Sequence, residues 1–474
     1  MQHFPILRAG SAYRSLNTLT VKDFRTGEAI AQLSLANTGL IRNDFSEAAN
    51  NKLALEALPI AELLKMCKNA AHLFLHEELP VDEASQSPDE YVRLLSLSTG
   101  MPEGLCRLNM AKIYAVLNEM EAVLGGLTRG LDLSILDTGW GEQNTRTLSY
   151  LCQTRALGAI LPNNSPGVHS LWLPSIPLKV PLMIKPGSQE PWTPFRIIQA
   201  FLAAGCPPQA FGYYPTDYAG ANEILLRSER SMLFGGVAMV KAWENDPRVQ
   251  IHGPGWSKII VGTDKIDRWQ QYEDTIVDSI LINSGRSCLN ASSVWTPENG
   301  YQIAESLAQR LSQVPARALD DPQAQLAAFA NPLAARRISE MIDRGLAQGG
   351  AEDLTARYRD HGRLIEKDGC TFLLPTLVWC ESAEHPLANT ELLFPFASVV
   401  EYSEDTLFEQ IGQTLVATAL TADRKFIQKL LNSRNIDRLN IGAIPTCTIS
   451  WDQPHEGNLF EHLYKQRALQ MATG

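Results

Sequence analysis

The sequence predicts an α/β protein with two parallel-sheet domains and an additional β-arm. Strand-like and helix-like segments alternate over residues 180–262 and again after residue 288. Repeated strand–helix–strand order indicates a parallel sheet with helices on both faces and ligand sites at the carboxyl ends of the strands. The chain has 474 residues, of which 45% are hydrophobic, which is enough for two or three domains with sizeable cores.

The segment before the first alternating series is mostly helical. In residues 46–125 apolar side chains recur at three- and four-residue steps, which is the helical period. Residues 129–160 change character around the turn-rich stretch 137–144, "DTGWGEQN". We interpret 129–160 as a long antiparallel β-hairpin or arm.

The first alternating series begins with a strand at 181–185 and a well-signalled helix after it. Thr193 is predicted as the helix N-cap, with Pro194 at the first helical position and Gly205 just past the end. The remaining predicted elements are strand 210–215, helix 218–228, strand 231–236, helix 237–246, and strands 249–255 and 257–262. No GxGxxG motif is present, so the standard dinucleotide fingerprint is missing.

The second alternating series follows Cys288. Its predicted elements are strand 291–295, helices 298–313 and 322–347, strands 371–379 and 394–402, helix 403–413, strand 414–421, helix 423–433 and strand 438–444. The polar tail, 446–474, is predicted to end in an amphipathic helix over 459–470.

Composition excludes several classes of protein. The net charge of −11 makes a nucleic-acid or anionic-membrane partner unfavourable. The eight cysteines form no CxxC and no Cys/His cluster, so we expect reduced thiols and no metal site. No signal peptide is apparent, and prolines interrupt the most apolar stretch, 171–186, so no membrane span is expected. We therefore expect a cytoplasmic protein.

Five segments, in order, resemble landmarks of the aldehyde dehydrogenase superfamily, most closely its CoA-acylating and acyl-reductase branch. They are "LPNNSPGV" (161–168), "PLMIKPGSQEPWTPFRI" (181–197), "MLFGG" (232–236), "NSGRSC" (283–288) and "TFLLPTLVWCESAEHPLANTELLFPFASVVEY" (371–402). The resemblance implies a nucleotide-binding domain over 1–128 and 161–255 and a catalytic domain over 256–440. It also implies an oligomerisation arm and tail, 129–160 and 441–474, pairing subunits into a homodimer or homotetramer.

Cys288 matches the nucleophilic cysteine of that family. Its thiolate would attack an aldehyde carbonyl to form a thiohemiacetal, or a thioester to form a tetrahedral adduct. The alternative is an inert buried cysteine, which we favour for the other seven. Arg286 could lower the pKa of this thiol, although such an arginine more often makes a structural salt bridge.

Asn164 matches the asparagine of the family's oxyanion hole. Its amide and the Cys288 backbone N–H would both donate to the oxygen that gains charge at the attacked carbon. The alternative is a turn asparagine with local hydrogen bonds, and the adjacent Asn163 allows a register error of one residue.

The resemblance also implies cofactor contacts at Pro162, Lys185, Ser188, Gly236 and Glu391. Lys185 matches the lysine on the adenosine ribose, but it could equally be a solvated strand end. Ser188 stands where many NAD-using members have a glutamate, and a serine beside a lysine would accept a 2′-phosphate that a carboxylate would repel. We therefore predict NADP or NAD, with NADP favoured.

Glu391 matches the glutamate on the nicotinamide ribose. The alternative is a surface carboxylate that precedes a strand. Its surroundings depart from the family pattern, because Phe394 stands where a glycine is expected.

His252 is the most informative departure, because it replaces the glutamate that activates water in hydrolytic members. The "HGPG" that begins here is similar to the CoA-acylating branch, where a thiol accepts the acyl group. Alternatively His252 is itself the base, since imidazole titrates near neutral pH, or it is a hydrogen-bonded histidine at a strand end.

Three functions follow. The leading one is an NAD(P)-dependent oxidoreductase that interconverts an aldehyde and an acyl-thioester through a thioester on Cys288, with CoA as co-substrate. The second is a hydrolytic aldehyde dehydrogenase with His252 as base. The third is a catalytically silent family member that acts as a binding subunit.

Overall fold

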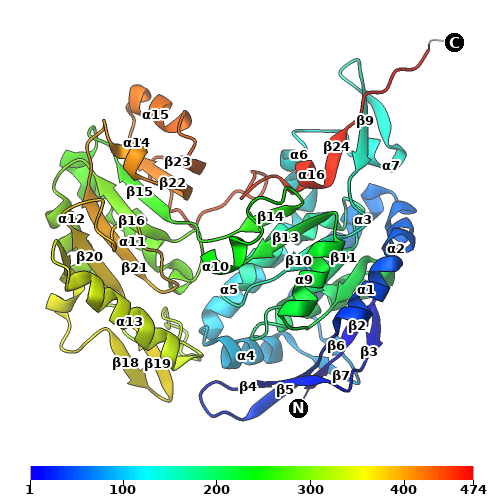
Figure 1. The fold of residues 1–474 in the computed structure, drawn as a ribbon, viewed down its shortest axis with the longest axis horizontal. Helices are drawn as coiled ribbons and strands as arrows, with labels where there is room; N and C mark the ends of the chain where they lie inside the picture. The colour runs from blue at the N-terminus through cyan, green and yellow to red at the C-terminus, as the bar shows by residue number, and fades with distance from the viewer. Residues whose placement is uncertain (1, 473–474) are drawn as a thin grey trace. The chain divides into compact units, whose positions relative to one another are not determined.

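The computed structural model describes residues 2–472, which form two compact units that are both drawn in Figure 1. Unit 1 comprises the chain up to Ser98, Cys106–Gly253, and the chain from Ser450 on; unit 2 comprises Thr99–Leu105 and Pro254–Ile449. These bounds describe packing. The assignment of nucleotide-binding, catalytic and oligomerising roles to parts of the chain stays a prediction.

Unit 1 is built on a seven-stranded sheet of order β14-β13-β10-β11-β12-β2-β3. Its strands are β14 (Val249–His252), β13 (Arg230–Phe234), β10 (Leu157–Ile160), β11 (Leu182–Lys185), β12 (Phe211–Tyr213), β2 (Ile6–Arg8) and β3 (Ser11–Tyr13). The first five pair in parallel, and β2 and β3 are antiparallel. The predicted parallel sheet is confirmed, and β10 belongs to it rather than to the arm.

Helices pack on this sheet. Figure 1 shows α9 (Tyr218–Arg227) lying over β10 and β11, and α1 (Thr38–Ser46) packs against α9. The other helices that begin within unit 1 or run into it are α2 (Ala48–Glu56), α3 (Ile60–His76), α4 (Pro88–Thr99), α5 (Glu103–Asn118), α6 (Met120–Leu127), α7 (Ile135–Thr138), α8 (Trp192–Ala203), α10 (Val237–Val240), α16 (Leu459–Leu463) and the 3₁₀ turns η1 (Pro166–Leu171), η2 (Leu173–Ser175) and η3 (Pro208–Ala210). The helical prediction for 46–125 is confirmed, whereas the helix predicted over 237–246 is only the short α10.

The start of α8 differs from the prediction. Pro191 is the N-cap and Trp192 the first helical residue, so Thr193 lies inside the first turn. The Thr193 N–H and hydroxyl both donate to Glu190 Oε1, at 2.9 and 2.5 Å. The Glu190 carboxylate therefore does the capping expected of Thr193, which suits the positive end of a helix dipole. Gly205 ends the helix region with φ of 88°, as predicted.

The arm is shorter and more composite than the predicted hairpin. β8 (Trp140–Gln143) and β9 (Arg146–Cys152) form an antiparallel hairpin, and β24 (Tyr464–Gln466) adds to β9 as a third strand. The helix predicted over 459–470 is wrong beyond Leu463. Strand pairing with β9 overrides the helical period there, because the partner strand satisfies the backbone groups of β24.

Unit 1 also contains two small sheets near the N-terminus. One pairs β1 (Gln2–Phe4), β5 (Ala29–Ser34) and β4 (Thr18–Lys22), and the other pairs β6 (Leu79–Val81) with β7 (Ala84–Gln86).

Unit 2 is built on a second seven-stranded sheet, of order β17-β20-β21-β16-β15-β22-β23. Its strands are β17 (Ala351–Asp353), β20 (Thr376–Cys380), β21 (Phe396–Glu401), β16 (Ala291–Thr296), β15 (Ser257–Val261), β22 (Thr414–Leu420) and β23 (Ile436–Ile441). All neighbours pair in parallel except β17 with β20. The central strands are buried along almost their whole length, as both-face coverage by helices requires.

The helical elements of unit 2 are mostly as predicted. They are η4 (Ile266–Tyr272), α11 (Glu273–Leu281), η5 (Ile282–Gly285), α12 (Gly300–Ser312), α13 (Pro332–Leu346), η6 (Leu354–Tyr358), α14 (Leu407–Gln410) and α15 (Arg424–Leu431), with a hairpin of β18 (Leu364–Lys367) and β19 (Cys370–Leu373). The helix predicted over 322–347 begins only at Pro332, with Asn331 as N-cap. Proline disfavours helix in the preceding residue, so this start has a local cause. Within residues 2–472 no helix has the length and apolar character needed to cross a membrane.

Candidate active site

The loop that carries the candidate nucleophile has an unusual backbone. Asn283, Ser284 and Gly285 all have positive φ values, of 58°, 58° and 64°. A Cβ added to Gly285 would lie 2.4 Å from the carbonyl carbon of Phe394, so only glycine fits there. The Asn290 amide closes the loop by donating to the carbonyls of Ser279, Ile280 and Ile282. The glycine of "NSGRSC" is thus required by the backbone.

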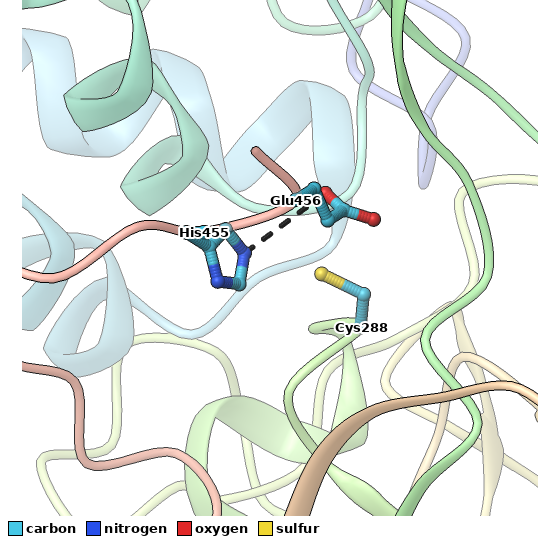
Figure 2. A group of neighbouring side chains, drawn as sticks. All are labelled: Cys288, His455 and Glu456. Atoms are coloured by element: carbon cyan, nitrogen blue, oxygen red, sulfur yellow. Dashed lines mark ion pairs between the residues drawn. The ribbon is translucent and has the colours of Figure 1, made fainter. Parts of the chain in front are cut away.

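Cys288 lies in the turn between η5 and β16 and is half-buried; its side chain is labelled in Figure 2. Its carbonyl oxygen accepts a 2.8 Å hydrogen bond from Ser257 Oγ. A Cβ on Gly255 would lie 2.0 Å from the same oxygen. Ser257, the first residue of β15, therefore holds the Cys288 carbonyl, and the lack of a side chain at Gly255 leaves room for that carbonyl to approach.

Four of the other cysteines are poorly suited to act as nucleophiles. Burial raises the pKa of Cys206 and of Cys380 to about 12, and it raises the pKa of Cys67 and Cys152 as well. Such thiols stay protonated at neutral pH, which supports the prediction that they are inert.

Glu391 contacts the same turn as Cys288. Its Oε2 accepts a 2.5 Å hydrogen bond from the backbone N–H of Trp256, between the two residues that touch Cys288. Glu391 is half-buried, and its predicted contact with the nicotinamide ribose stays a prediction. Phe394, in the position where a glycine was expected, is 3% exposed and its backbone packs on Gly285.

Arg286 has a structural role. Its guanidinium is buried and donates to the carbonyl oxygens of Thr99 (2.7 Å) and Ala328. It also lies 5.8 Å from the centre of the Phe329 ring. These contacts hold the loop that carries Cys288 against Thr99, Ala328 and Phe329.

In unit 1, Asn163 and Asn164 lie in the loop that follows β10. Asn163 Oδ1 accepts a 2.8 Å hydrogen bond from the Gln189 N–H and so ties this loop to the one that follows β11. Asn164 is half-buried. The oxyanion role of Asn164 stays a prediction.

The predicted cofactor residues of unit 1 converge at one sheet edge. Pro162, Lys185 and Gly236 follow or end three adjacent parallel strands, β10, β11 and β13, at their carboxyl ends. Burial lowers the pKa of Lys185, and Ser188 is exposed. Around Gly236 a Cβ would meet nothing within 4 Å. A basic group, an exposed hydroxyl and an open glycine at this edge fit a dinucleotide.

His252 ends β14 and is 4% exposed. Its Nδ1 forms a short hydrogen bond with the Glu456 carboxylate, and its ring stacks on Phe234 with centroids 4.3 Å apart. Nε2 has no hydrogen-bond partner within residues 2–472. This arrangement, in which a carboxylate orients Nδ1 while the buried Nε2 bonds to no described group, is compatible with a general base, a role that stays a prediction. It fits poorly with a fully satisfied structural histidine.

Glu456 is the functional candidate that the sequence did not reveal. It follows His455, whose Nε2 lies 4.0 Å from the Glu456 carboxylate, drawn as a dashed line in Figure 2. Gln250, two residues before His252 on β14, donates its amide to the Glu456 carbonyl oxygen at 2.5 Å. Positive φ values at Glu456 (51°) and Gly457 (107°) turn the chain here. The only local signal was an acid before a glycine in a segment assigned to the tail.

A buried polar chain supports the loops of unit 1. His169, on η1, contacts Glu190 through Nε2 at 2.7 Å and receives the Trp172 indole N–H on Nδ1 at 3.1 Å. Glu190 in turn accepts from Thr193, whose hydroxyl contacts Tyr91 at 2.7 Å. This network joins the segment after Asn164 to the loop after Lys185 and to the start of α8.

Two parallel-sheet units, one with a basic sheet edge and one with a constrained cysteine, are the organisation of a nucleotide-dependent oxidoreductase. The chain belongs to the aldehyde dehydrogenase family, whose model matches residues 13–455. It is thus an NAD(P)-dependent aldehyde oxidoreductase, and the family resemblance is confirmed. The matched range ends one residue before Glu456.

Several solved structures have the same fold as this chain. The chain is similar to the aldehyde dehydrogenase KauB from Pseudomonas aeruginosa (TM-score 0.81, 16% identity, covering 99% of this chain and 96% of that one). It is also similar to aldehyde dehydrogenase 21 from Physcomitrella patens, in complex with succinate (0.79, 15%, 99% and 98%). A third is the NAD⁺ complex of an aldehyde dehydrogenase from Bacillus cereus (0.78, 15%, 98% and 96%). No curated protein sequence matches the chain.

Proposed function

We propose that the chain oxidises an aldehyde through a covalent thioester on Cys288. The thiolate attacks the carbonyl carbon, and the resulting thiohemiacetal loses a hydride to become a thioester. The observation that carries this proposal is the double constraint on the Cys288 carbonyl by Ser257 and Gly255. A nucleophile gains from such a fixed backbone, because the attack geometry is set before the substrate binds.

Asn164 and the Cys288 N–H are proposed to donate to the oxyanion. Pro162, Lys185, Ser188 and Gly236 would hold the adenosine part of the dinucleotide, and Glu391 the nicotinamide ribose. A bound nicotinamide would supply the hydride acceptor. The exposed Ser188 near Lys185 favours NADP over NAD.

The acyl acceptor is proposed to be water, activated by His252. The specific observation that favours this second hypothesis over release to CoA is an imidazole that Glu456 orients through Nδ1, with a buried Nε2 that bonds to no described group. His252 Nε2 would take a proton from water as the water oxygen attacks the thioester carbon, and the Cys288 thiolate would leave. Release to CoA stays the rival, because the hydrolytic glutamate is replaced.

A single-turnover experiment separates the two acceptors. Wild-type protein, His252→Ala and Glu456→Gln are mixed with an aldehyde and NADP⁺, with or without CoA, and NADPH formation is followed. The water route predicts an intact NADPH burst in both variants, with steady-state turnover lowered about 10²–10⁴-fold in His252→Ala. His361→Ala, at an exposed histidine, is the matched control. Unchanged turnover in His252→Ala with a strong acceleration by CoA would establish the thiol route instead.

Two further properties belong to the proposal. The family resemblance supports a homodimer or homotetramer, and the scattered positions of the eight cysteines, with no CxxC motif, support a reducing, cytoplasmic setting. Size-exclusion chromatography with light scattering tests the first. The silent-subunit alternative is the least supported, because Cys288 and Asn164 are both present.

A further inference from the structure

Lys258 is a buried lysine at the centre of the unit 2 sheet. It lies on β15, is 1% exposed, and its register partners are the uncharged Ser293 on β16 and Ala417 on β22. Lysines are almost never buried this far unless their charge is compensated. The roles proposed for the other site residues do not account for this buried charge.

The Lys258 ammonium satisfies its donors with three nearby oxygens. Nζ donates to the Trp256 carbonyl at 2.6 Å, to Thr414 Oγ1 at 3.1 Å and to the Gln413 carbonyl at 3.3 Å. An ammonium has three protons to donate, so the charged form matches this cage in number. A neutral amine has only two.

The first of these contacts fixes a strained residue. Trp256 has φ of 43°, in the left-handed region that a bulky side chain rarely adopts. Its N–H donates to Glu391 and its carbonyl accepts from Lys258. Glu391 and Lys258 thus bond to the N–H and to the carbonyl of Trp256, respectively. The residues on either side of Trp256, Gly255 and Ser257, lie against the Cys288 carbonyl.

Lys258 also responds to pH in the neutral range. Burial lowers the pKa of Lys258 to about 7, and the negative charge of Glu391 acts in the opposite direction. Glu391 is the charged group that interacts electrostatically with the Lys258 ammonium. Below pH 7 the ammonium favours the Glu391 carboxylate electrostatically, and above pH 7 that support is lost.

We propose that Lys258 is a positioning residue that sets the cofactor affinity of Glu391, so that nicotinamide dinucleotide binding weakens as Lys258 loses its proton. This inference rests on the proposed role of Glu391 as the ligand of the nicotinamide ribose. It adds a residue that touches neither cofactor nor substrate and acts through the Trp256 turn.

The test measures the Kd of NADPH and NADH by fluorescence across neutral pH for four proteins. The wild type should lose affinity around pH 7. Lys258→Arg keeps its charge, so it should bind with no transition near neutrality. Lys258→Met should bind about tenfold or more weakly at acidic pH and show no transition. Thr414→Val removes one oxygen of the cage without a charge, so it should keep the wild-type transition.

Each outcome decides the inference. If the Kd of Lys258→Arg still changes around pH 7, another group is responsible for the titration, and the inference is overturned. A Lys258→Met protein that is less stable but binds like the wild type at every pH reduces Lys258 to a structural role. If Lys258→Met does not fold, the comparison of Lys258→Arg with Thr414→Val still decides. A wild type that binds neither nucleotide refutes the proposed function, and the inference fails with it.

Discussion

Replacing Glu190 by glutamine tests the buried network of unit 1. Glu190 is 1% exposed and faces three donors: His169 Nε2 at 2.7 Å, and the N–H and hydroxyl of Thr193 at 2.9 and 2.5 Å. The Trp172 indole donates to His169 Nδ1, which must therefore carry a lone pair, so the ring proton sits on Nε2. Both oxygens of the Glu190 carboxylate therefore have to act as hydrogen-bond acceptors.

Glutamine supplies an acceptor on one side only. Whichever way the amide is turned, its NH₂ faces either the His169 N–H or the Thr193 N–H, and one buried donor is left unsatisfied. That costs about 1–3 kcal/mol, and weaker neutral hydrogen bonds add to it. Relief of carboxylate desolvation offsets part of this cost. We expect a net destabilisation of about 2 kcal/mol, or a Tm lower by roughly 2–4 °C.

The assay is thermal and urea unfolding of Glu190→Gln beside Gln189→Ala. The Gln189 side chain is exposed, and only its backbone N–H bonds to Asn163, so this control should melt like the wild type. A Glu190→Gln protein within about 0.5 kcal/mol of the wild type would refute the argument from donor counting. Equal losses in both variants would assign the effect to the loop rather than to the carboxylate.

Three other outcomes are expected. Ser188→Glu should lower the NADP-to-NAD ratio of kcat/KM about tenfold or more by repelling the 2′-phosphate, and an unchanged ratio would count against the assigned site. Ser257→Ala removes the donor to the Cys288 carbonyl and should lower the free energy of unfolding by about 1–3 kcal/mol in urea. With pKa values of about 12, Cys206 and Cys380 carry roughly 10⁻⁴ thiolate at pH 8, rising about tenfold per pH unit, so iodoacetamide should label Cys288 well before either. Earlier labelling of those two cysteines in the folded protein would contradict their burial.

The parallel sheets and most of their strands could be predicted because their signals are local. Alternation of apolar strands with helical periods specifies a parallel sheet without knowledge of distant contacts. Gly285 is required by its own positive φ and by the close approach of the Phe394 backbone. The glycine in the motif "NSGRSC" therefore reports the shape of this loop. The predicted N-cap of α8, Thr193, lies two residues after the observed one, Pro191. Thr193–Pro194 has the sequence pattern of a helix start, but the capping hydrogen bonds are accepted by Glu190.

Long-range partners could not be predicted. The hydrogen bond of His252 with Glu456 spans 204 residues, and neither residue carries a pattern that points to the other. The strand β24 has a helical apolar period, and only its pairing with β9 makes it extended. In both cases the deciding interaction is tertiary, which a single sequence does not display.

The contact between His252 and Glu456 also has a consequence for how the protein is made. A ribosome finishes β14 and the whole of unit 2 before it adds the residue that orients this imidazole, and β24 comes later still. Nascent chains would therefore hold a formed thiol loop while the proposed water-activating pair is still incomplete. Removal of Glu456 should therefore abolish the proposed hydrolytic step while leaving unit 2 folded.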